Sequence, residues 1–292
     1  MNLYLHRPVF EKSILFYLDV HANQTLLDCT CGEGGHGEIF LSSFKEHFQY
    51  IGLDRDLEIL TIAKERLFPL SKNSIFIHTS YADAKEALQP YHISQVDRIL
   101  VDLGVSMFQI MHPDRGFSFT SNDRLDMRFD QKKIGISAYD IVNSFNEEEI
   151  SDIIYTYGEE YAARKIARFI IAERNRKKIV TCSDLAYIVS RVKGKNGKIN
   201  PATQTFQALR IYVNSEFHEI QALCNLLPDL LRTNGKVAFI TYHSLEDRFI
   251  KQFMKSSEFI KPINKKVITP ESEEIASNPA SRSAKLRIGF RT

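Results

Sequence analysis

The sequence predicts an α/β fold in which a doubly wound, mostly parallel sheet is interrupted by a helical insertion. Four apolar runs rich in Ile, Leu, Val and Phe alternate with helix-like segments, a pattern typical of parallel strands joined by crossover helices. A glycine-rich turn follows the first run directly, and the strand pattern stops between 113 and 200, where helical periodicity replaces it. We therefore expect a sheet domain formed by residues 1–112 and 201–292, and a helical insertion over 113–200.

The expected elements follow in order along the chain. Strands are expected near 25–30, 49–54, 74–79 and 97–103, separated by helices at 37–47, 57–67 and 83–90. The insertion contains a basic helix over 159–176. A long helix over 201–232 then ends at Asn234-Gly235, a common helix stop signal. The chain closes with a strand at 236–242, a helix at 245–255 and short strands around 259–268 and 285–290.

The turn after the first strand indicates a nucleotide site. Glycines 32, 34 and 37 fit the G-x-G-x-x-G spacing, which lets backbone approach a nucleotide at a helix N-terminus. Asp54 ends the next apolar run, where a carboxylate can accept both hydroxyls of a ribose. The first sixty residues therefore resemble half of a nucleotide-binding sheet.

Two further acids bear on which nucleotide is bound, because the glycine spacing fits a nicotinamide enzyme as well as a methyltransferase. Asp28 and Asp102 each end an apolar run. A carboxylate beside the pyrophosphate of a dinucleotide is repelled by it. The same carboxylate suits S-adenosylmethionine, which carries an ammonium and a sulfonium but no phosphate. The acids favour the methyltransferase, with the dehydrogenase as the alternative.

Composition sets the broad class. The 292 residues are 43% hydrophobic and 25% charged, as in ordinary globular proteins. No apolar run approaches the roughly 18 residues of a membrane span, and the first twenty residues lack the pattern of a signal peptide. The four cysteines form no metal-ligand pattern, so we expect reduced thiols, no metal and a cytoplasmic protein without membrane contact.

Charge is segregated along the chain, although the net charge is only +2. Residues 164–198 hold eleven Lys or Arg against two acids, and more cations crowd the C-terminus. Such segregation favours a surface that faces a polyanion, here a nucleic acid.

Polar strings downstream of the glycine turn extend these indications. They are DLGVS at 102–106, RGFSF at 115–119, LDMR at 125–128, FQALR at 206–210, HSLEDR at 243–248 and SRSAKLR at 281–287. In this order, and from residue 6 to residue 287, they closely resemble the bacterial small-subunit ribosomal RNA cytosine-N4 methyltransferases. The resemblance implies the S-adenosylmethionine-dependent methyltransferase fold with a substrate-recognition insertion. It also implies N4-methylation of a cytidine in the decoding centre of the 16S ribosomal RNA. We expect this RNA to be the partner, within the small ribosomal subunit, although the sequence leaves open whether the substrate is free RNA or an assembled subunit. It also leaves open whether the chain forms a homodimer.

The resemblance also implies site residues. The S-adenosylmethionine positions would be Gly34, Gly35, His36, Asp54, Tyr81, Asp102 and Gln109. Asp102 would be the catalytic acceptor of the amine's protons, alone or with backbone carbonyls of Leu103 and Gly104. Substrate contacts would come from Arg115, Arg124, Arg210, His243, Arg248, Arg282 and Lys285. Met107 and Gln204 depart from residues common in the family, and the second departure bears on one RNA contact.

Two alternatives stay open at this level. One is a methyltransferase that acts on DNA or another nucleic acid, because a basic surface does not distinguish RNA from DNA. The other is a non-catalytic RNA-binding or ribosome assembly factor that keeps the fold. An intact glycine turn and Asp54 argue against the second alternative.

Overall fold

The computed structural model of the chain describes residues 8–44, 47–194 and 200–292, and these residues form two compact units. The first unit, which we call the sheet unit, comprises residues 1–106 and 218–292. The second, the helical unit, comprises residues 107–217. Among the described residues, no helix is both long enough and apolar enough to span a bilayer.

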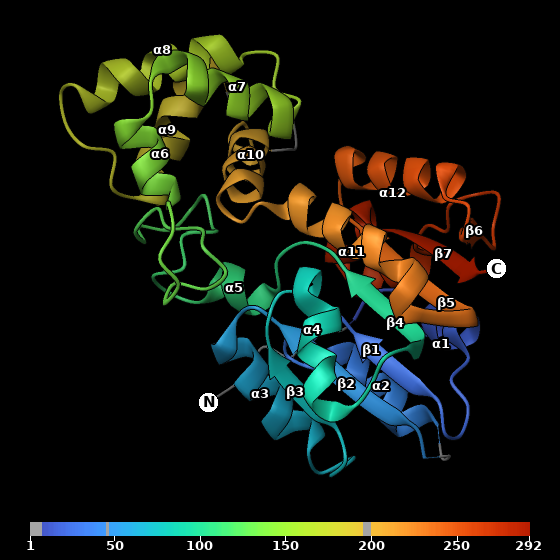
Figure 1. Cartoon of the computed structure of the whole chain (residues 1–292). Helices are drawn as coiled ribbons and strands as arrows, with labels where there is room; N and C mark the ends of the chain where they lie inside the picture. The colour runs from blue at the N-terminus through green and yellow to red at the C-terminus, as the bar shows by residue number, and fades with distance from the viewer. Residues whose placement is uncertain (1–7, 45–46, 195–199) are drawn as a thin grey trace. The chain divides into compact units, whose positions relative to one another are not determined.

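The sheet unit holds seven strands in the order β3-β2-β1-β4-β5-β7-β6 (Figure 1). Their bounds are β1 Thr25–Asp28, β2 Gln49–Asp54, β3 Ile75–His78, β4 Val96–Asp102, β5 Leu231–Thr241, β6 Ile260–Pro262 and β7 Lys285–Arg291. Strands β1 to β5 run parallel, whereas β7 pairs antiparallel with β5 and β6 antiparallel with β7. The predicted doubly wound, mostly parallel sheet is confirmed, and the order reverses beside β1, where ligands of such sheets bind.

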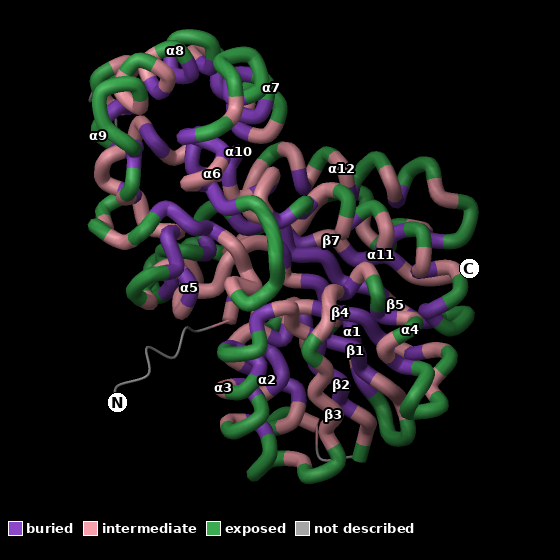
Figure 2. Tube along the Cα trace, turned by 60° about the vertical axis from the view of Figure 1, so that its left-hand side comes forward, coloured by how far each residue is buried: buried purple, intermediate pink, exposed green. Residues whose placement is uncertain are grey.

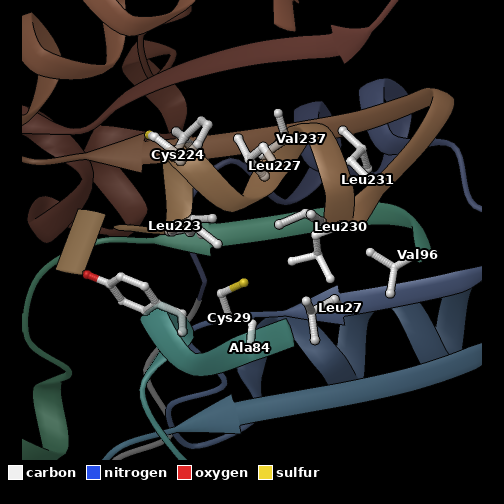
Figure 3. Close-up of a cluster of buried hydrophobic side chains, with 14 of the residues drawn as sticks. Leu27, Cys29, Ala84, Val96, Leu223, Cys224, Leu227, Leu230, Leu231 and Val237 are labelled. Atoms are coloured by element: carbon white, nitrogen blue, oxygen red, sulfur yellow. The ribbon is translucent and has the colours of Figure 1, made fainter. Parts of the chain in front are cut away.

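Both faces of the sheet are buried because successive strand residues point to opposite sides. Leu27 of β1 joins a core cluster with Leu223 and Leu227, whereas its neighbour Leu26 joins a second cluster with Phe40. Figure 3 shows the first cluster, in which side chains of α11 lie over those of β1, β4 and β5. The central strands are accordingly purple for most of their length in Figure 2.

The helices of the sheet unit flank these strands. They are α1 Glu11–Leu18, α2 Gly35–Ser43, α3 Leu57–Leu67, α4 Ala84–Leu88, α12 Ser244–Ser256 and α13 Ser272–Ser277, with the short 3-10 turns η1 Tyr81–Asp83, η2 Gln89–Tyr91 and η3 Pro279–Ser283. Helix α11, Glu216–Leu230, also packs here for most of its length. Helix α2 begins two residues earlier than expected, because Gly34 takes a left-handed φ of 81° and turns the chain into the helix at once.

The helical unit has its own hydrophobic core. Its helices are α5 Met107–Met111, α6 Ala138–Ser144, α7 Glu147–Gly158, α8 Ala163–Arg174, α9 Cys182–Lys193 and α10 Thr203–Val213. Apolar side chains of α6 to α10, together with Leu125 and Met127, form this cluster. Helices α6, α7 and α9 each start with a reciprocal capping box, in which the N-cap side chain and the third helical residue each accept a backbone N–H. The basic helix is shorter than expected, because Glu159 has a left-handed φ of 52° and α8 begins only at Ala163.

The long helix expected over 201–232 is wrong, since two helices occupy that stretch. Helix α10 ends at Val213, and Ser215 has a φ of 52° that no α-helix accommodates. Asn214 fixes the break by donating its side-chain amide to the carbonyls of Met127 and Arg210, at 2.7 and 2.9 Å. Helix α10 packs against α7, so the chain divides at 106/107 and 217/218, whereas the sequence placed the divisions at 112/113 and 200/201.

Candidate active site at the carboxyl ends of the strands

The glycine turn forms an open helix N-terminus. Helix α2 starts after Gly34, and no described side chain caps it, so its first N–H groups are left for other acceptors. Such a terminus favours an anionic group, for example the carboxylate of a bound ligand. Gly37 has a packing role instead, because a Cβ there would lie 2.6 Å from the Tyr50 hydroxyl. The uncapped start of α2 at Gly34 and Gly35 is therefore the part of the turn that offers backbone N–H groups to a ligand.

Asp54 ties the end of β2 to the glycine turn. Its Oδ2 accepts the Gly32 N–H at 2.9 Å, and its Oδ1 accepts the Asp56 N–H at 2.8 Å. Each carboxylate oxygen can accept a further hydrogen bond, so the ribose role remains open to it. Desolvation raises the pKa of Asp54 to about 7, opposed by the hydrogen bond from Gly32.

Asp28 lies behind this turn and is not a ligand-facing group. Its side chain is only 1% exposed, and its oxygens accept hydrogen bonds from the Tyr50 hydroxyl at 2.9 Å and the Thr30 N–H at 3.2 Å. Burial raises its pKa to about 6. The expectation that Asp28 faces the cofactor is therefore wrong, because the residue supports the turn from within the core.

Asp102, at the end of β4, contacts side chains of two other segments at the sheet edge. Its Oδ1 accepts the hydroxyl of Tyr242 at 2.9 Å, and its Oδ2 lies 3.7 Å from Nδ1 of His36. Its own N–H donates to Oγ1 of Thr30 at 2.7 Å, which links β4 to the glycine turn. Desolvation raises the pKa of Asp102 to about 7, aided by the negative charges of Glu246 and Glu33.

His36 is held in one orientation by a backbone acceptor. Its Nε2 lies 3.0 Å from the carbonyl of Val9, and a carbonyl can only accept, so Nε2 carries a hydrogen. Burial lowers the pKa of His36, which favours the neutral ring with a lone pair at Nδ1. His36 therefore presents an acceptor, not a donor, to Asp102.

The other two expected cofactor residues are placed differently. Tyr81 follows β3 and is 9% exposed, within the apolar cluster that contains Ala84 and Leu223. Gln109 is buried on α5, in the helical unit. The sheet unit thus brings together Gly34, Gly35, His36, Asp54 and Asp102 along one edge. The cofactor roles of these residues, and those of Tyr81 and Gln109, remain predictions.

The expected substrate contacts in the sheet unit lie around α12 and β7. His243 caps α12 in a capping box with Glu246, and Arg248 and Arg282 are exposed. Lys285 donates to Asp247 at 3.2 Å, and Arg287 donates to the other oxygen of the same carboxylate at 2.7 Å. Of these residues, Arg248 and Arg282 are the exposed ones.

Two expected contacts in the helical unit have internal partners. Arg115 is 5% exposed and donates to the carbonyl of Phe129 at 3.3 Å. Arg210 makes a two-pronged pair with Glu216, from Nε at 2.8 Å and from the terminal nitrogen at 2.9 Å. Arg124 is exposed, with its guanidinium over the ring of Tyr139 at 5.2 Å. Arg115 and Arg210 thus have partners that stabilise the unit, and Arg124 remains accessible.

Sequence reasoning missed the residues that support Asp102 and the most exposed aromatic of the helical unit. Tyr242 was assigned only to a strand, although a polar aromatic at the carboxyl end of β5 is a usable signal. Glu246 is 1% exposed and accepts the Tyr242 N–H at 2.8 Å. Tyr161 is 93% exposed in the turn just before α8, a property that no sequence pattern indicates.

Comparison with known proteins identifies relatives along the whole chain. Residues 3–291 match the MraW methylase family. The ribosomal RNA small subunit methyltransferase H of Dictyoglomus turgidum is 43% identical over 98% of this chain and 97% of its own. The proteins of that name from Coprothermobacter proteolyticus and a Sulfurihydrogenibium species are 42% and 43% identical, each over 98% of this chain and over 96% and 99% of their own.

Proposed function

The chain belongs to the MraW methylase family and is an S-adenosylmethionine-dependent methyltransferase, and we propose that it methylates N4 of a cytidine in the decoding centre of small-subunit ribosomal RNA. The main support for ribosomal RNA as the substrate is the whole-length similarity to the small subunit methyltransferases H. The acids and the open helix terminus at the strand ends support the choice of cofactor.

The residues of the sheet edge fit S-adenosylmethionine. Asp54 accepts hydrogen bonds from a ribose, and the uncapped start of α2 at Gly34 and Gly35 accommodates a carboxylate. Asp102 and the neutral His36 offer acceptors to an ammonium. Tyr81 beside the adenine and Gln109 complete the proposed set on the strength of the family resemblance.

The chemistry assigns a role to Asp102. S-adenosylmethionine, when bound, supplies a methyl group activated by a sulfonium. The N4 amine of cytosine is a poor nucleophile because its lone pair is delocalised into the ring. The protein must hold the amine in line and stabilise the positive charge that develops on N4 as the new N–C bond forms. Ionised Asp102 accepts the amine's hydrogen bond and then its proton, with the carbonyls of Leu103 and Gly104 as further acceptors.

An outward-facing row on α8 supports nucleic acid as the substrate. Arg164, Lys165 and Arg168 lie along one side of α8, because they are three and four residues apart. Tyr161 lies just before the helix, and all four residues are exposed. Arg164 and Lys165 make no ion pair within the described part of the chain, and Arg168 lies 3.6 Å from Glu147. Tyrosine stacks on unpaired bases and the cations bind phosphates. By contrast, Arg174 is tied to the carbonyls of Val142 and Phe145.

A direct assay tests the function. The purified chain is incubated with methyl-labelled S-adenosylmethionine and either naked 16S ribosomal RNA or small subunits from cells lacking the protein. Nucleosides are then separated by mass spectrometry. We expect labelled N4-methylcytidine; label on DNA cytosine would favour the other nucleic acid. Calorimetry with S-adenosylmethionine separates the assembly-factor alternative, because a non-catalytic binder gives neither cofactor heat nor product.

The same proposal includes three finer points. We infer that the substrate is presented within an assembled small subunit and that the protein works in the cytoplasm, where that subunit is found. Higher activity on subunits than on naked RNA is the expected result. A homodimer remains a prediction, which sedimentation analysis tests.

A further inference from the structure

Tyr242 lies directly beyond the last residue of β5, next to the end of β4. Its hydroxyl donates to Oδ1 of Asp102 at 2.9 Å, across two neighbouring parallel strands. Burial raises the pKa of Tyr242 well above its ordinary value, and the nearby charge of Asp102 acts in the same direction. The hydroxyl therefore keeps its hydrogen throughout the neutral range and acts as a fixed donor.

The backbone of Tyr242 is held as well as its hydroxyl. Its N–H donates to Oε2 of Glu246 at 2.8 Å, and the N–H of His243 donates to the same oxygen at 3.3 Å. Glu246 is buried in the first turn of α12. The two hydrogen bonds to Glu246 hold the turn from β5 into α12 in place, which limits the orientations open to the ring of Tyr242.

The other charged groups around Asp102 do not hold it in place. His36 of α2 presents a lone pair to Oδ2, because its hydrogen is on the nitrogen facing Val9. Glu246 of α12 and Glu33 of the glycine turn are negative and disfavour an ionised Asp102, and Asp28 of β1 is a further acid in the same field. Among the described residues, Tyr242 is the side chain that donates a hydrogen bond to this carboxyl.

We propose that Tyr242 is a positioning residue for methyl transfer, which fixes Oδ1 of Asp102, leaves Oδ2 for the bound ligands and stabilises the carboxylate form by donating a hydrogen bond to it. The assignment of Asp102 to the reaction rests on the proposed function. The effect of Tyr242 on Asp102 does not, because it follows from contacts within the sheet unit. A hydrogen bond to the ionised form stabilises a carboxylate, and here it opposes the desolvation that disfavours it.

The first experiment measures Asp102 without cofactor or substrate. The aspartate carboxyls are labelled with carbon-13 and their shifts are followed against pH in the wild type and in Tyr242→Phe, with Asp102→Asn identifying the resonance. We expect the midpoint of Asp102 in the Phe variant to rise by about one pH unit, because a charge-assisted hydrogen bond is removed. An unchanged midpoint would overturn the proposal.

Tyr17→Phe is the matched control. It removes a hydroxyl that accepts a hydrogen bond from Asn264 at 2.9 Å in the same unit, without contact to Asp102. Its Asp102 titration should match that of the wild type. A rise in both variants would show a general effect of removing a tyrosine hydroxyl and would also overturn the proposal.

The second experiment asks whether the hydrogen bond matters for methylation. Single-turnover rates are measured against pH at saturating S-adenosylmethionine. We expect the acid limb of Tyr242→Phe to move upward together with the NMR midpoint, while the rate on the alkaline plateau falls less than about threefold. An unmoved limb beside a moved midpoint would exclude the catalytic role of the hydrogen bond. A wild type that labels no RNA would reject the proposed function but leave the titration result standing.

Discussion

The acids at the strand ends of the sheet unit and the motif arginines of the helical unit are placed in opposite ways. In the sheet unit, motif residues at strand ends, Asp54 and Asp102, sit half-buried with raised pKa values at the edge where ligands bind. In the helical unit, the motif arginines Arg115 and Arg210 turn inward to a carbonyl and a carboxylate. The cations that face outward there, such as Arg164 and Lys165, belong to no motif.

The difference teaches how far a motif can be interpreted. A strand end in a parallel sheet places a residue at the edge where ligands bind, because all the strands deliver their carboxyl ends to one edge, although the side chain can still turn into the core as that of Asp28 does. Side chains on a helix point in all directions around its axis. A polar residue that bridges two segments can therefore stabilise the fold as readily as it can bind a substrate. Variants in both units test this contrast, from the largest expected effect to the smallest.

Replacing Asp102 by Asn should have the largest effect. The variant keeps an acceptor oxygen but loses the charge that stabilises the developing cation on N4. We expect the single-turnover rate at saturating cofactor to fall by roughly 10²-fold or more, as for other preorganised electrostatic groups. A rate close to that of the wild type would transfer the acceptor role to the carbonyls of Leu103 and Gly104.

Replacing Arg210 by Ala should cost stability rather than binding. It leaves Glu216 buried without its partner, and breaking such a pair typically costs on the order of 3 kcal/mol. Chemical denaturation measures the loss, and Arg164→Ala is the matched exposed control, expected to change stability by less than about 0.5 kcal/mol. If the Arg210→Ala variant has normal stability but binds RNA less tightly, Arg210 is a substrate contact, and the contrast between the two units is wrong.

Replacing Asp54 by Ala should weaken S-adenosylmethionine binding by about 2–3 kcal/mol, because ribose hydroxyls lose their acceptor in a desolvated site. Calorimetry measures the affinity. Asp54→Asn retains one acceptor oxygen and should lose less. Equal affinity in the wild type and both variants would remove Asp54 from the cofactor site.

Removing the outward charges of α8 should weaken RNA binding moderately and change its salt dependence. For Arg164→Ala combined with Lys165→Ala, the slope of log affinity against log salt should fall by about 0.7 for each phosphate of a single strand that is no longer neutralised. Cofactor affinity should be unaltered. Lys64→Ala combined with Lys72→Ala, two exposed cations of the sheet unit, serves as the control and should leave the slope unchanged. If both double variants show the same slope as the wild type, Arg164 and Lys165 do not contact the RNA.

The smallest effect concerns pH. The folded pKa values of Asp54 and Asp102 are raised from 3.8 to about 7, so ionising them opposes folding of the ligand-free protein as pH rises from about 4 to 7. Ligand groups that prefer the ionised carboxylates lower those values. We therefore expect S-adenosylmethionine binding at pH 7 to release protons and to weaken below pH 7. Calorimetry in buffers of different ionisation enthalpy measures the number of protons released on binding. Proton uptake on binding would contradict the assignment of Asp54 and Asp102 to the cofactor site. The Asp102→Asn variant should release fewer protons than the wild type.

The sequence located most of the sheet correctly. Alternation of apolar runs and helical segments placed β1 to β4, and Asp54 and Asp102 were identified because each ends such a run. The capping boxes on α6, α7 and α9 mark helix starts by local chemistry alone. The break between α10 and α11 was missed, because apolar periodicity continues across it and the bond of Asn214 to Met127 depends on a segment distant in sequence.

What the sequence determined by itself was therefore the order of the elements, the glycine turn and the acids at the strand ends, since these follow from local periodicity and from the common direction of parallel strands. Only the tertiary structure decided which polar groups meet. Asp28 is buried against Tyr50 and Asp102 is bonded to Tyr242, pairs that lie 22 and 140 residues apart in the chain. Burial and neighbouring charge, which set the proton affinity of each acid, arise only when these distant segments pack together.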